Sequence, residues 1–199
     1  MTTGESPRIG GVVLAAGASR RAGTVKALAA IDGEAFVARA VRTLREGGCD
    51  EVVVVVGPPH AERVTAAVAG ARVVENPAPA QGMLSSLQVA LDDRWEAAVV
   101  SLVDHPRVRI ETVRALIAAF GASDAELVRP VFEGRGGHPY VVARRVFAAL
   151  RAGDPAIGPR PIYAACARLD VPVDDPAVRE DLDTAEAIAT VTGGRRSPA

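Results

Sequence analysis

Five consecutive valines, Val52 to Val56, follow Glu51 and place the strongest constraint on the fold. β-branched side chains favour extended backbone, and a strand that is apolar at every position must bury both of its faces. Strands of this kind are typical of parallel sheets, whose two faces are covered by helices. The segment from Glu51 to Val56 is therefore predicted to be a core strand of a parallel sheet.

Similar apolar runs alternate with segments of helical spacing along most of the chain. The first run, Ile9 to Ala16, ends in a loop of small residues, and a helical pattern stops at Gly47 and Gly48. The predicted strands are 9–16, 51–56, 72–75, 97–102, 126–132, 140–142 (antiparallel) and 169–173, and the predicted helices are 35–45, 61–68, 84–91, 111–120, 145–151 and 185–191.

This β-α-β-α order implies right-handed crossovers and a mostly parallel sheet. We therefore expect a three-layer α/β/α sandwich with a Rossmann-like sheet and a small antiparallel addition. A chain of 199 residues can bury one sizeable core, so a single domain over 1–199 is expected. Its core is predicted to span about 8–192, with a disordered tail at 193–199.

The composition argues against nucleic acid and membranes as partners. The chain is 49% hydrophobic and 24% charged, with a formal net charge of -1, so it has no basic surplus that would bind a polyanion. Residues 1–8 lack the basic segment followed by an apolar core that is typical of a signal sequence, and no apolar run approaches the roughly 18 residues of a membrane span. We expect a cytoplasmic protein, in which Cys49 and Cys166 are small core or surface thiols rather than disulfide or zinc ligands.

Lys26 is the single lysine among 23 basic residues. A GC-rich genome exchanges lysine for arginine wherever chemistry permits, so this position is one where arginine fails, unless the lysine survives by chance. A compact ammonium on a flexible stem can follow a phosphate during a reaction, whereas a planar guanidinium cannot occupy the same volume. Lys26 is therefore a candidate catalytic residue.

Lys26 ends a loop that follows the first predicted strand. Residues 14–26 read LAAGASRRAGTVK, with two glycines and two arginines among small or hydroxyl residues. In an open parallel sheet, ligands bind at this end of the strand, and small residues let main-chain N–H groups approach phosphate oxygens. The loop matches neither the Walker pattern nor the GxGxxG fingerprint. It indicates phosphate binding, with a plain solvated connection as the alternative.

The same loop resembles the LAAGxSxRxGxxK signature of nucleotidyltransferases with a glycosyltransferase-A-like, or nucleotide-diphospho-sugar transferase-like, fold. Within these it most resembles the molybdenum cofactor cytidylyltransferases of the MobA- and MocA-like group. The resemblance implies that the loop cradles a nucleoside triphosphate. Guanylyltransferase relatives carry LAGG where this chain has LAAG, which favours CTP over GTP. The implied nucleotide-binding residues are Leu14, Ala15, Ala16, Gly17, Ser19, Arg21, Gly23 and Lys26, of which Arg21 and Lys26 bind the phosphates and are also implied to be catalytic.

Asp104 follows the predicted strand 97–102, where a carboxylate can hold a hard cation. Its surroundings resemble the family's GDQP motif, whose aspartate holds Mg²⁺, which makes Asp104 a metal ligand and a catalytic residue by resemblance. The segment DLDTAE at 181–186 resembles the family's C-terminal DIDTPEDL. It implies that Asp181 or Asp183 completes the Mg²⁺ site, although Asp183 could instead cap the last helix.

Three further segments resemble the family. The stretch from Asn76 to Leu87 is similar to NPxxxxGMxxSL, which lies near the nucleotide base and sugar; Ser85 or Ser86 could equally be a simple helix cap. Residues 133–139, EGRGGHP, are similar to the acceptor-side GRRGHP, although His138 could simply satisfy a turn, and residues 153–160 partly match GDxGxR. His105 is expected to be a surface histidine at a turn. The implied site residues are Asn76, Gly82, Ser85 and Ser86 for the nucleotide, and Arg135, His138 and Arg160 for the acceptor.

Together these resemblances imply an enzyme that transfers CMP from CTP to the phosphate of a molybdopterin-type cofactor and releases pyrophosphate, with Mg²⁺ as cofactor. A molybdoenzyme or its chaperone is a further expected partner. One alternative is an enzyme of the same fold that uses GTP, or that acts on a sugar phosphate or a small phosphorylated acid. Another is a non-catalytic carrier or insertion partner of a molybdoenzyme. A carrier has no need for pyrophosphate stabilisation by Lys26, Arg21 and Asp104.

Overall fold

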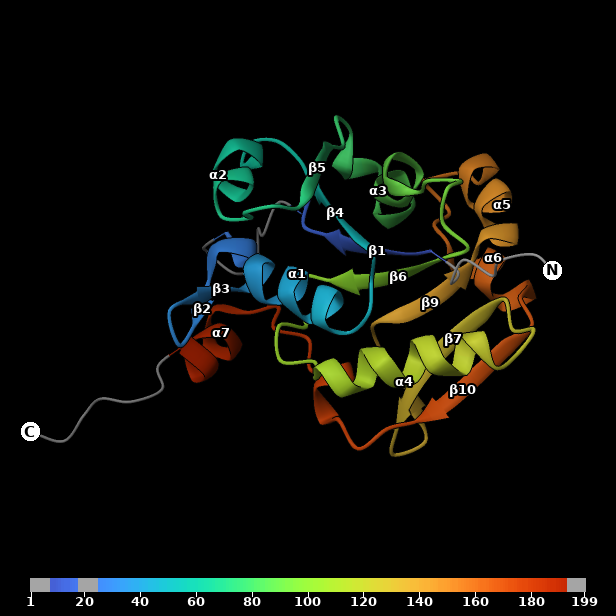
Figure 1. Cartoon of the computed structure of the whole chain (residues 1–199). Helices are drawn as coiled ribbons and strands as arrows, with labels where there is room; N and C mark the ends of the chain where they lie inside the picture. Colours follow the sequence, from blue (N-terminus) through green and yellow to red (C-terminus); the bar gives the residue numbers. More distant parts are fainter. Residues whose placement is uncertain (1–7, 18–24, 193–199) are drawn as a thin grey trace, which may run out of the picture.

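The structure, a computed structural model, describes residues 8–17 and 25–192. Its centre is an eight-stranded sheet in the order β10-β7-β9-β6-β1-β4-β5, with β8 paired to β7 (Figure 1). All neighbours are parallel except β9, which runs against β6 and β7, and β8, which runs against β7. The strands are β1 (Ile9–Leu14), β4 (Glu51–Val56), β5 (Arg72–Glu75), β6 (Ala97–Leu102), β7 (Leu127–Phe132), β8 (Arg135–Gly136), β9 (Tyr140–Ala143) and β10 (Arg168–Pro172).

The valine run lies in β4 and is buried on both faces, as predicted. Val52, Val54 and Val56 belong to one core cluster, with residues of α1 (Phe36–Glu46) and α4 (Ile110–Gly121). Val53 and Val55 point the other way, into a second cluster with α3 (Met83–Ala90) and α5 (Phe147–Ala152). In Figure 1, α3 and α5 lie above β1 and β6, and α1 and α4 lie in front and below. The predicted three-layer α/β/α fold is confirmed.

The remaining helices are short. The predicted helix at 145–151 is divided into a 3-10 helix and α5, and the helix α6 was not predicted. The expected tail at 193–199 lies outside the described residues. Within the described part of the chain, no helix has the length and apolar character that a membrane crossing requires. These helices are α2 (Ala61–Ala66), α6 (Arg160–Ala165), α7 (Ala185–Thr192), η1 (Lys26–Leu28), η2 (Pro79–Gln81), η3 (Arg144–Val146) and η4 (Pro176–Arg179).

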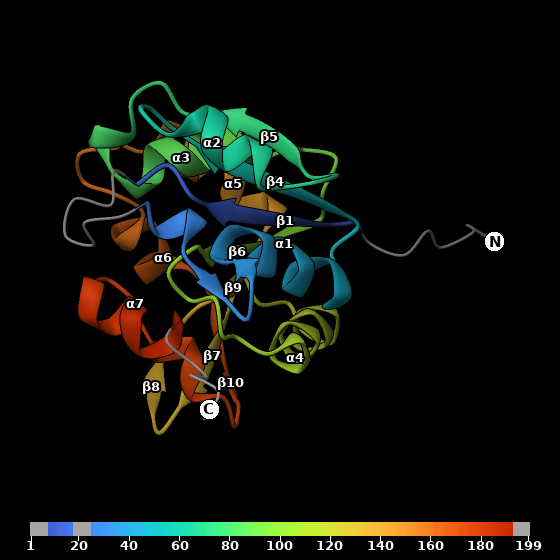
Figure 2. The same cartoon turned by 90° about the vertical axis from the view of Figure 1, so that its left-hand side faces the viewer.

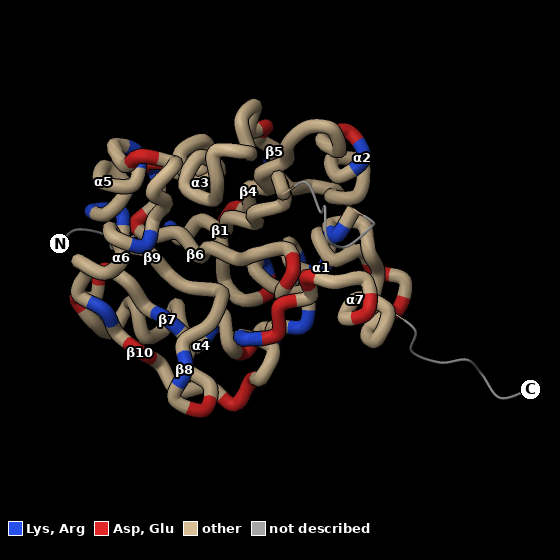
Figure 3. The backbone as a smooth tube through the Cα atoms, turned by 180° about the vertical axis from the view of Figure 1, so that it is seen from behind, with Lys and Arg blue, Asp and Glu red and all other residues tan. Residues whose placement is uncertain are grey.

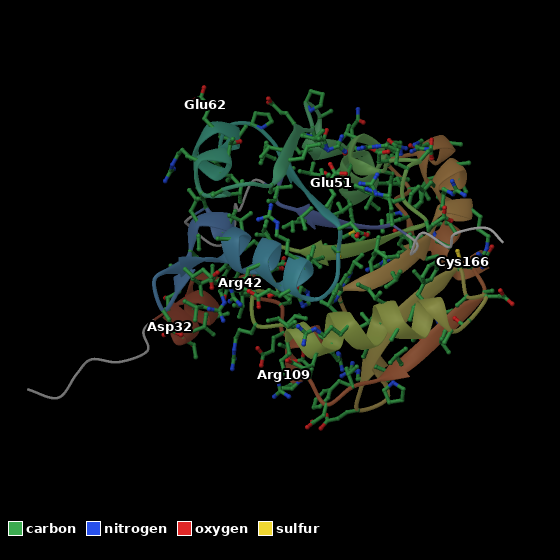
Figure 4. The ribbon with its side chains drawn as sticks, in the orientation of Figure 1. Asp32, Arg42, Glu51, Glu62, Arg109 and Cys166 are labelled. Atoms are coloured by element: carbon green, nitrogen blue, oxygen red, sulfur yellow. The ribbon has the colours of Figure 1, made fainter. Side chains whose placement is uncertain are left out.

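A two-residue hairpin, which the sequence pattern did not predict, lies between η1 and α1. Its strands are β2 (Ala30–Ile31) and β3 (Glu34–Ala35), joined by Asp32 and Gly33, whose φ angles are 52° and 82°. Positive φ at both turn positions is the geometry for which an Asp-Gly pair is suited. Figure 4 labels Asp32 in this turn, at the left end of the molecule.

Parallel pairing of β1, β4 and β6 brings their carboxyl ends to the same edge of the sheet. That edge lies at the left of Figure 1 and faces the viewer in Figure 2, beside the β2-β3 hairpin and α7. Basic and acidic residues are interspersed along the backbone seen from behind in Figure 3. The loops after β1 and β6, which carry most of the predicted site residues, therefore meet at one edge.

The packing of β1 on Trp95 gives a test of the core. A Cβ built at Gly10 would lie 2.1 Å from Cδ2 of Trp95, whose side chain is 1% exposed. We expect Gly10→Ala to lower the free energy of unfolding in urea by about 1–3 kcal/mol, because a buried indole cannot move aside. Gly17→Ala is the matched control: no atom of the described residues lies within 4 Å of its Cβ position, so stability should change by less than about 0.5 kcal/mol. Equal stability of the two variants would contradict this packing.

Candidate active site

A cavity of about 230 Å³ opens at the carboxyl edge of the sheet. Ala15 continues from β1 by donating its N–H to the Val55 carbonyl at 2.9 Å, which directs the loop across the end of β4. Five of the predicted loop residues, Leu14 to Gly17 and Lys26, line the cavity. Ser19, Arg21 and Gly23 lie outside the described residues. The described residues that line the cavity are Leu14, Ala15, Ala16, Gly17, Lys26, Ala27, Pro79, Gly82, Met83, Ser86, Leu102, Val103 and Asp104.

Lys26 joins the cavity to two carboxylates that are distant in sequence. Its Nζ donates to Oδ2 of Asp104 at 3.2 Å and to Oδ1 of Asp183. The three side chains are only 16–26% exposed. Burial alone would lower the pKa of Lys26, but the hydrogen bonds and negative charges of Asp183 and Asp104 outweigh it and raise this pKa. The ammonium is therefore fully charged at neutral pH.

Three carboxylates form an acidic cluster around this ammonium. One oxygen from each of Asp104, Asp181 and Asp183 lies within 4.8 Å of the other two. Partial burial and the charges of Asp104 and Asp183 raise the pKa of Asp181. Oδ1 of Asp104 is buried and, among the described atoms, accepts no hydrogen bond. An all-oxygen donor set with an orphaned buried oxygen fits a hard divalent cation such as Mg²⁺.

The segment that carries Asp181 and Asp183 is held by buried hydrogen bonds. Asp175, 2% exposed, accepts from the backbone N–H of Arg109 at 2.9 Å and from the Thr112 hydroxyl at 2.7 Å. This ties η4 to the start of α4, where Figure 4 labels Arg109. Farther along, the Leu182 N–H donates to the Asp104 carbonyl at 3.1 Å. These bonds fix the C-terminal aspartates beside the end of β6.

His105 is buried rather than on the surface, so that prediction is wrong. Its side chain is 6% exposed, and Nδ1 lies 3.2 Å from the carbonyl oxygen of Ala177 in η4. The backbone N–H of His138 donates to Val178 in the same segment at 2.9 Å. Both histidines thus lie against η4, a tertiary contact that a sequence pattern does not reveal.

Asp183 does not cap the last helix. The Thr184 hydroxyl takes that place, because it accepts from the Ala187 N–H at 3.2 Å.

Asn76, Ser85 and Ser86 form a buried hydrogen-bonded cluster that shapes the turn at Gly82. The Asn76 amide donates to Ser85 at 2.8 Å and to Ser86 at 3.0 Å, and the Ser85 hydroxyl donates to the Gly82 carbonyl at 2.8 Å. Gly82 has φ of 102°, which a side chain would strain. Only Gly82 and Ser86 of this group line the cavity. This hydrogen-bonded cluster therefore holds the backbone of the turn against the cavity.

The predicted acceptor residues divide between two places. His138 and Arg160 line a second cavity of about 250 Å³, and Met83 lines both cavities, so the two adjoin. Arg135 is exposed on β8 and does not line this second cavity. Sequence reasoning missed Tyr140 and Tyr163, which also line it. Tyr140 could have been noticed because it follows the Gly-His-Pro segment directly, whereas Tyr163 lies in the unpredicted helix α6.

The cysteines take no part in this site. Both thiols are free, and burial, together with the negative charge of Asp50, raises the pKa of Cys49 to about 12. Burial also raises the pKa of Cys166, which Figure 4 labels at the end of the molecule opposite Asp32. A thiol that stays protonated at neutral pH is a poor nucleophile or metal ligand. This agrees with the prediction of two small core or surface thiols.

The acidic cluster gives a test that does not depend on turnover. Replacing Lys26 by Met leaves Asp104, Asp181 and Asp183 without the ammonium that lies between two of them, so we expect the variant to lose roughly 1–2 kcal/mol of stability. A divalent cation should replace the lost charge. Millimolar Mn²⁺ or Mg²⁺ should therefore raise the melting temperature of Lys26→Met more than that of the wild type.

The matched control is Arg42→Met. It removes a cation that lies outside the acidic cluster and whose Nε donates to Oε1 of Glu34 at 2.9 Å. Its melting temperature should respond to the metal as the wild type does. An identical metal response in Lys26→Met and the wild type would contradict a cation site at these carboxylates.

Comparison with known proteins reveals two similar curated proteins. The chain is 34% identical to nicotine blue oxidoreductase of Paenarthrobacter nicotinovorans over 200 residues. This alignment covers 90% of this chain and 94% of that protein. Over 148 residues, 68% of this chain, it is 39% identical to the bifunctional IPC transferase and DIPP synthase of Rubrobacter xylanophilus. The aligned part spans only 32% of that longer protein.

Solved structures share the fold. Rv0371c from Mycobacterium tuberculosis H37Rv aligns with a TM-score of 0.81 and 28% identity, covering 96% of this chain and 100% of that one. A complex of Rv0371c with manganese aligns with a TM-score of 0.76 and 27% identity, covering 94% and 100% of the two chains. The nucleotide-diphospho-sugar transferase-like fold is thereby confirmed.

A family profile described as the MobA-like NTP transferase domain matches residues 11–174. This range includes the loop after β1, Asp104 and all the described residues that line the two cavities, and Asp181 and Asp183 lie seven and nine residues beyond its end. Nucleotidyltransferases of this family use a divalent metal, which agrees with the acidic cluster at Lys26. The chain belongs to the family of MobA-like NTP transferase domains and is an enzyme of the nucleotidyltransferase type.

Proposed function

We propose that the protein transfers CMP from CTP to the phosphate of a molybdopterin-type cofactor and releases pyrophosphate. The observation that carries this proposal is the position of Lys26. Its ammonium contacts the carboxylates of Asp104 and Asp183 at the wall of a cavity that residues 14–17 also line. An ammonium at that point can bind phosphate oxygens while the carboxylates hold a cation.

In the proposed reaction, an oxygen of the acceptor's phosphate attacks the α-phosphorus of CTP, and the bond to the β-phosphate oxygen breaks. Lys26 and Arg21 stabilise the charge that develops on the leaving pyrophosphate, together with main-chain N–H groups of the loop. The acceptor phosphate is already ionised, so no strong general base is required. Rate acceleration then rests on positioning and on charge stabilisation.

Asp104 and Asp183 are proposed as the main metal ligands, because Lys26 contacts both and their oxygens converge on one point. Asp181, the more exposed carboxylate, is the third member of the cluster. Mg²⁺ bound there would neutralise phosphate charge and polarise the phosphoryl group. We propose Mg²⁺ as the resident ion in the cell.

For the nucleotide, we propose that Leu14 to Gly17 contact CTP together with Ser19, Gly23 and Gly82. Asn76, Ser85 and Ser86 would act mainly by shaping the turn at Gly82, through the hydrogen bonds described above. Arg135, His138 and Arg160 are proposed to serve the acceptor. A cytoplasmic location, a molybdoenzyme or its chaperone as recipient, and the absence of nucleic-acid partners complete the proposal.

A second candidate is redox chemistry, and it is favoured by one observation. The relative that this chain matches over 94% of its length is named an oxidoreductase rather than a transferase. An oxidoreductase would use the same cavities for an electron donor and an acceptor, with no need for Lys26 to stabilise pyrophosphate. Oxidation of NADPH by an added quinone or dye, in the absence of nucleoside triphosphate, would favour redox chemistry.

The proposal predicts pyrophosphate release that depends on acceptor, metal and nucleotide. Purified protein with Mg²⁺ and molybdopterin should release pyrophosphate from CTP faster than from GTP, and should release little without the acceptor. Lys26→Ala should lower turnover by about a hundredfold or more, as expected when a group that stabilises developing charge is removed. Full activity of Lys26→Ala would contradict the assigned role. Release with GTP alone would favour a guanylyltransferase of the same fold, and release with a sugar phosphate as acceptor would favour a sugar-phosphate nucleotidyltransferase.

The two C-terminal aspartates are predicted to differ in importance. Asp183→Asn should lower turnover by about a hundredfold or more, because a metal ligand contributes several kcal/mol to phosphoryl transfer. Asp181→Asn, its neighbour two positions away, serves as the matched control and should lose less than about tenfold. The apparent affinity for Mg²⁺ should fall most in Asp183→Asn. The reverse order would assign the metal site to Asp181.

A further inference from the structure

His105 is a buried side chain whose contact with η4 accounts for only one of its two ring nitrogens. Its backbone N–H donates to the Leu102 carbonyl at 3.2 Å, in the turn that follows β6. The side chain is 6% exposed, and Nδ1 lies 3.2 Å from the Ala177 carbonyl oxygen. A carbonyl oxygen only accepts, so Nδ1 carries the proton, and in the neutral ring Nε2 keeps a lone pair.

The lone pair on Nε2 lies close to a second acceptor atom. Oδ1 of Asp104 is 3.9 Å from Nε2, which is too far for a hydrogen bond, and no described group donates to Nε2. Oδ1 is itself buried and accepts no hydrogen bond from the described atoms, whereas Oδ2 of the same carboxylate accepts from Lys26 at 3.2 Å. Buried acceptors without a donor are costly, so this pair of atoms calls for a positive group between them.

The spacing of the two atoms suits a single metal ion. Metal–nitrogen and metal–oxygen bonds in proteins are about 2.1 Å long, so one ion can join two donor atoms up to roughly 4.2 Å apart. Nε2 and Oδ1, at 3.9 Å, lie within that reach. A histidine that binds a metal through one nitrogen commonly donates the other to a backbone carbonyl, which fixes the ring and its tautomer. The bond from Nδ1 to Ala177 is of this kind.

We propose that His105 is a nitrogen ligand of the cation held by Asp104, and that it gives the site a higher affinity for first-row transition metals than for Mg²⁺. The inference rests on the metal site of the proposed function, to which it adds a ligand. Imidazole suits transition metals, increasingly so from Mn²⁺ to Co²⁺, whereas Mg²⁺ favours oxygen ligands. Metal availability as well as affinity sets which ion is resident in a cell, so this preference is compatible with Mg²⁺ there.

Mn²⁺ alone, added to the full-length protein without nucleotide, tests this ligand directly. Pulsed EPR of the bound Mn²⁺ should show coupling to an imidazole nitrogen, and ¹⁵N-labelling of histidine should change that coupling. The chain has three histidines, so single replacements identify the ligand. His105→Asn should remove the coupling, because its amide can still donate to Ala177 but places no nitrogen lone pair at the Nε2 position. His60→Asn, the matched control, and His138→Asn should retain it.

The loss of affinity should depend on the ion. Calorimetric titration of His105→Asn should show binding of Mn²⁺ weakened about tenfold and that of Co²⁺ weakened more, while binding of Mg²⁺ changes by less than about threefold. His105→Gln is a second variant, which fills more of the ring volume and places an amide near the Nε2 position. It should also lose the imidazole coupling and the preference for Co²⁺. If His105 only held η4 in place, both variants would bind all three ions equally more weakly.

Several results would overturn the inference: no nitrogen coupling in the wild type, coupling that persists in both His105 variants, coupling that disappears only in His138→Asn, or an equal loss of affinity for all three ions. The isotope experiment on the wild type decides even if a variant fails to fold. If Mn²⁺ is bound through His105 but CTP gives no pyrophosphate, the proposed transfer fails and the ligand assignment stands. Metal-dependent transfer by a protein whose bound Mn²⁺ shows no nitrogen coupling would have the opposite meaning.

Discussion

The site depends on one interaction, the contact of Lys26 with Asp104 and Asp183, which are 78 and 157 positions farther along the chain. It joins the loop after β1, the end of β6 and the segment before α7. Without this contact, Lys26 would carry an uncompensated positive charge. The carboxylates of Asp104, Asp181 and Asp183 would repel one another. The ammonium compensates them in the metal-free protein. In the proposed reaction, it would pass to a phosphate when a cation takes its place.

The parallel sheet makes this contact possible. Parallel pairing of β1 with β4 and β6 puts their loops at one edge, and the buried Asp175 carboxylate holds η4 and the residues after it against the same edge. The reversed strand β9 then brings Tyr140 beside β6, so the second cavity adjoins the first at Met83. A reaction between two bound molecules needs such adjoining sites, since it proceeds only when the reacting atoms are held close together.

Much of the fold could be predicted because it follows from local patterns. Buried strands are apolar at every position, as in the valine run. Asp104 could be predicted because it follows such a strand, and Asp183 because its segment resembles a family motif. The features that were missed depend on tertiary contacts or weak local signals. Burial of His105 is set by η4, the charge of Arg129 is compensated by Asp170 on β10, and Tyr163 lies in a helix of only six residues. The hairpin at Asp32 did carry a local signal, its Asp-Gly pair, but its strands of two residues are too short to show an alternating pattern.

The central claim is that the enzyme moves a nucleoside monophosphate rather than electrons. Incubation of the protein with Mg²⁺, molybdopterin and CTP labelled at the α-phosphorus tests it most directly, with the products separated by chromatography. The label should appear in a new species that also contains the pterin, in an amount equal to the pyrophosphate released. Label that remains in CTP, while the same preparation oxidises NADPH with a quinone or dye, would contradict the account.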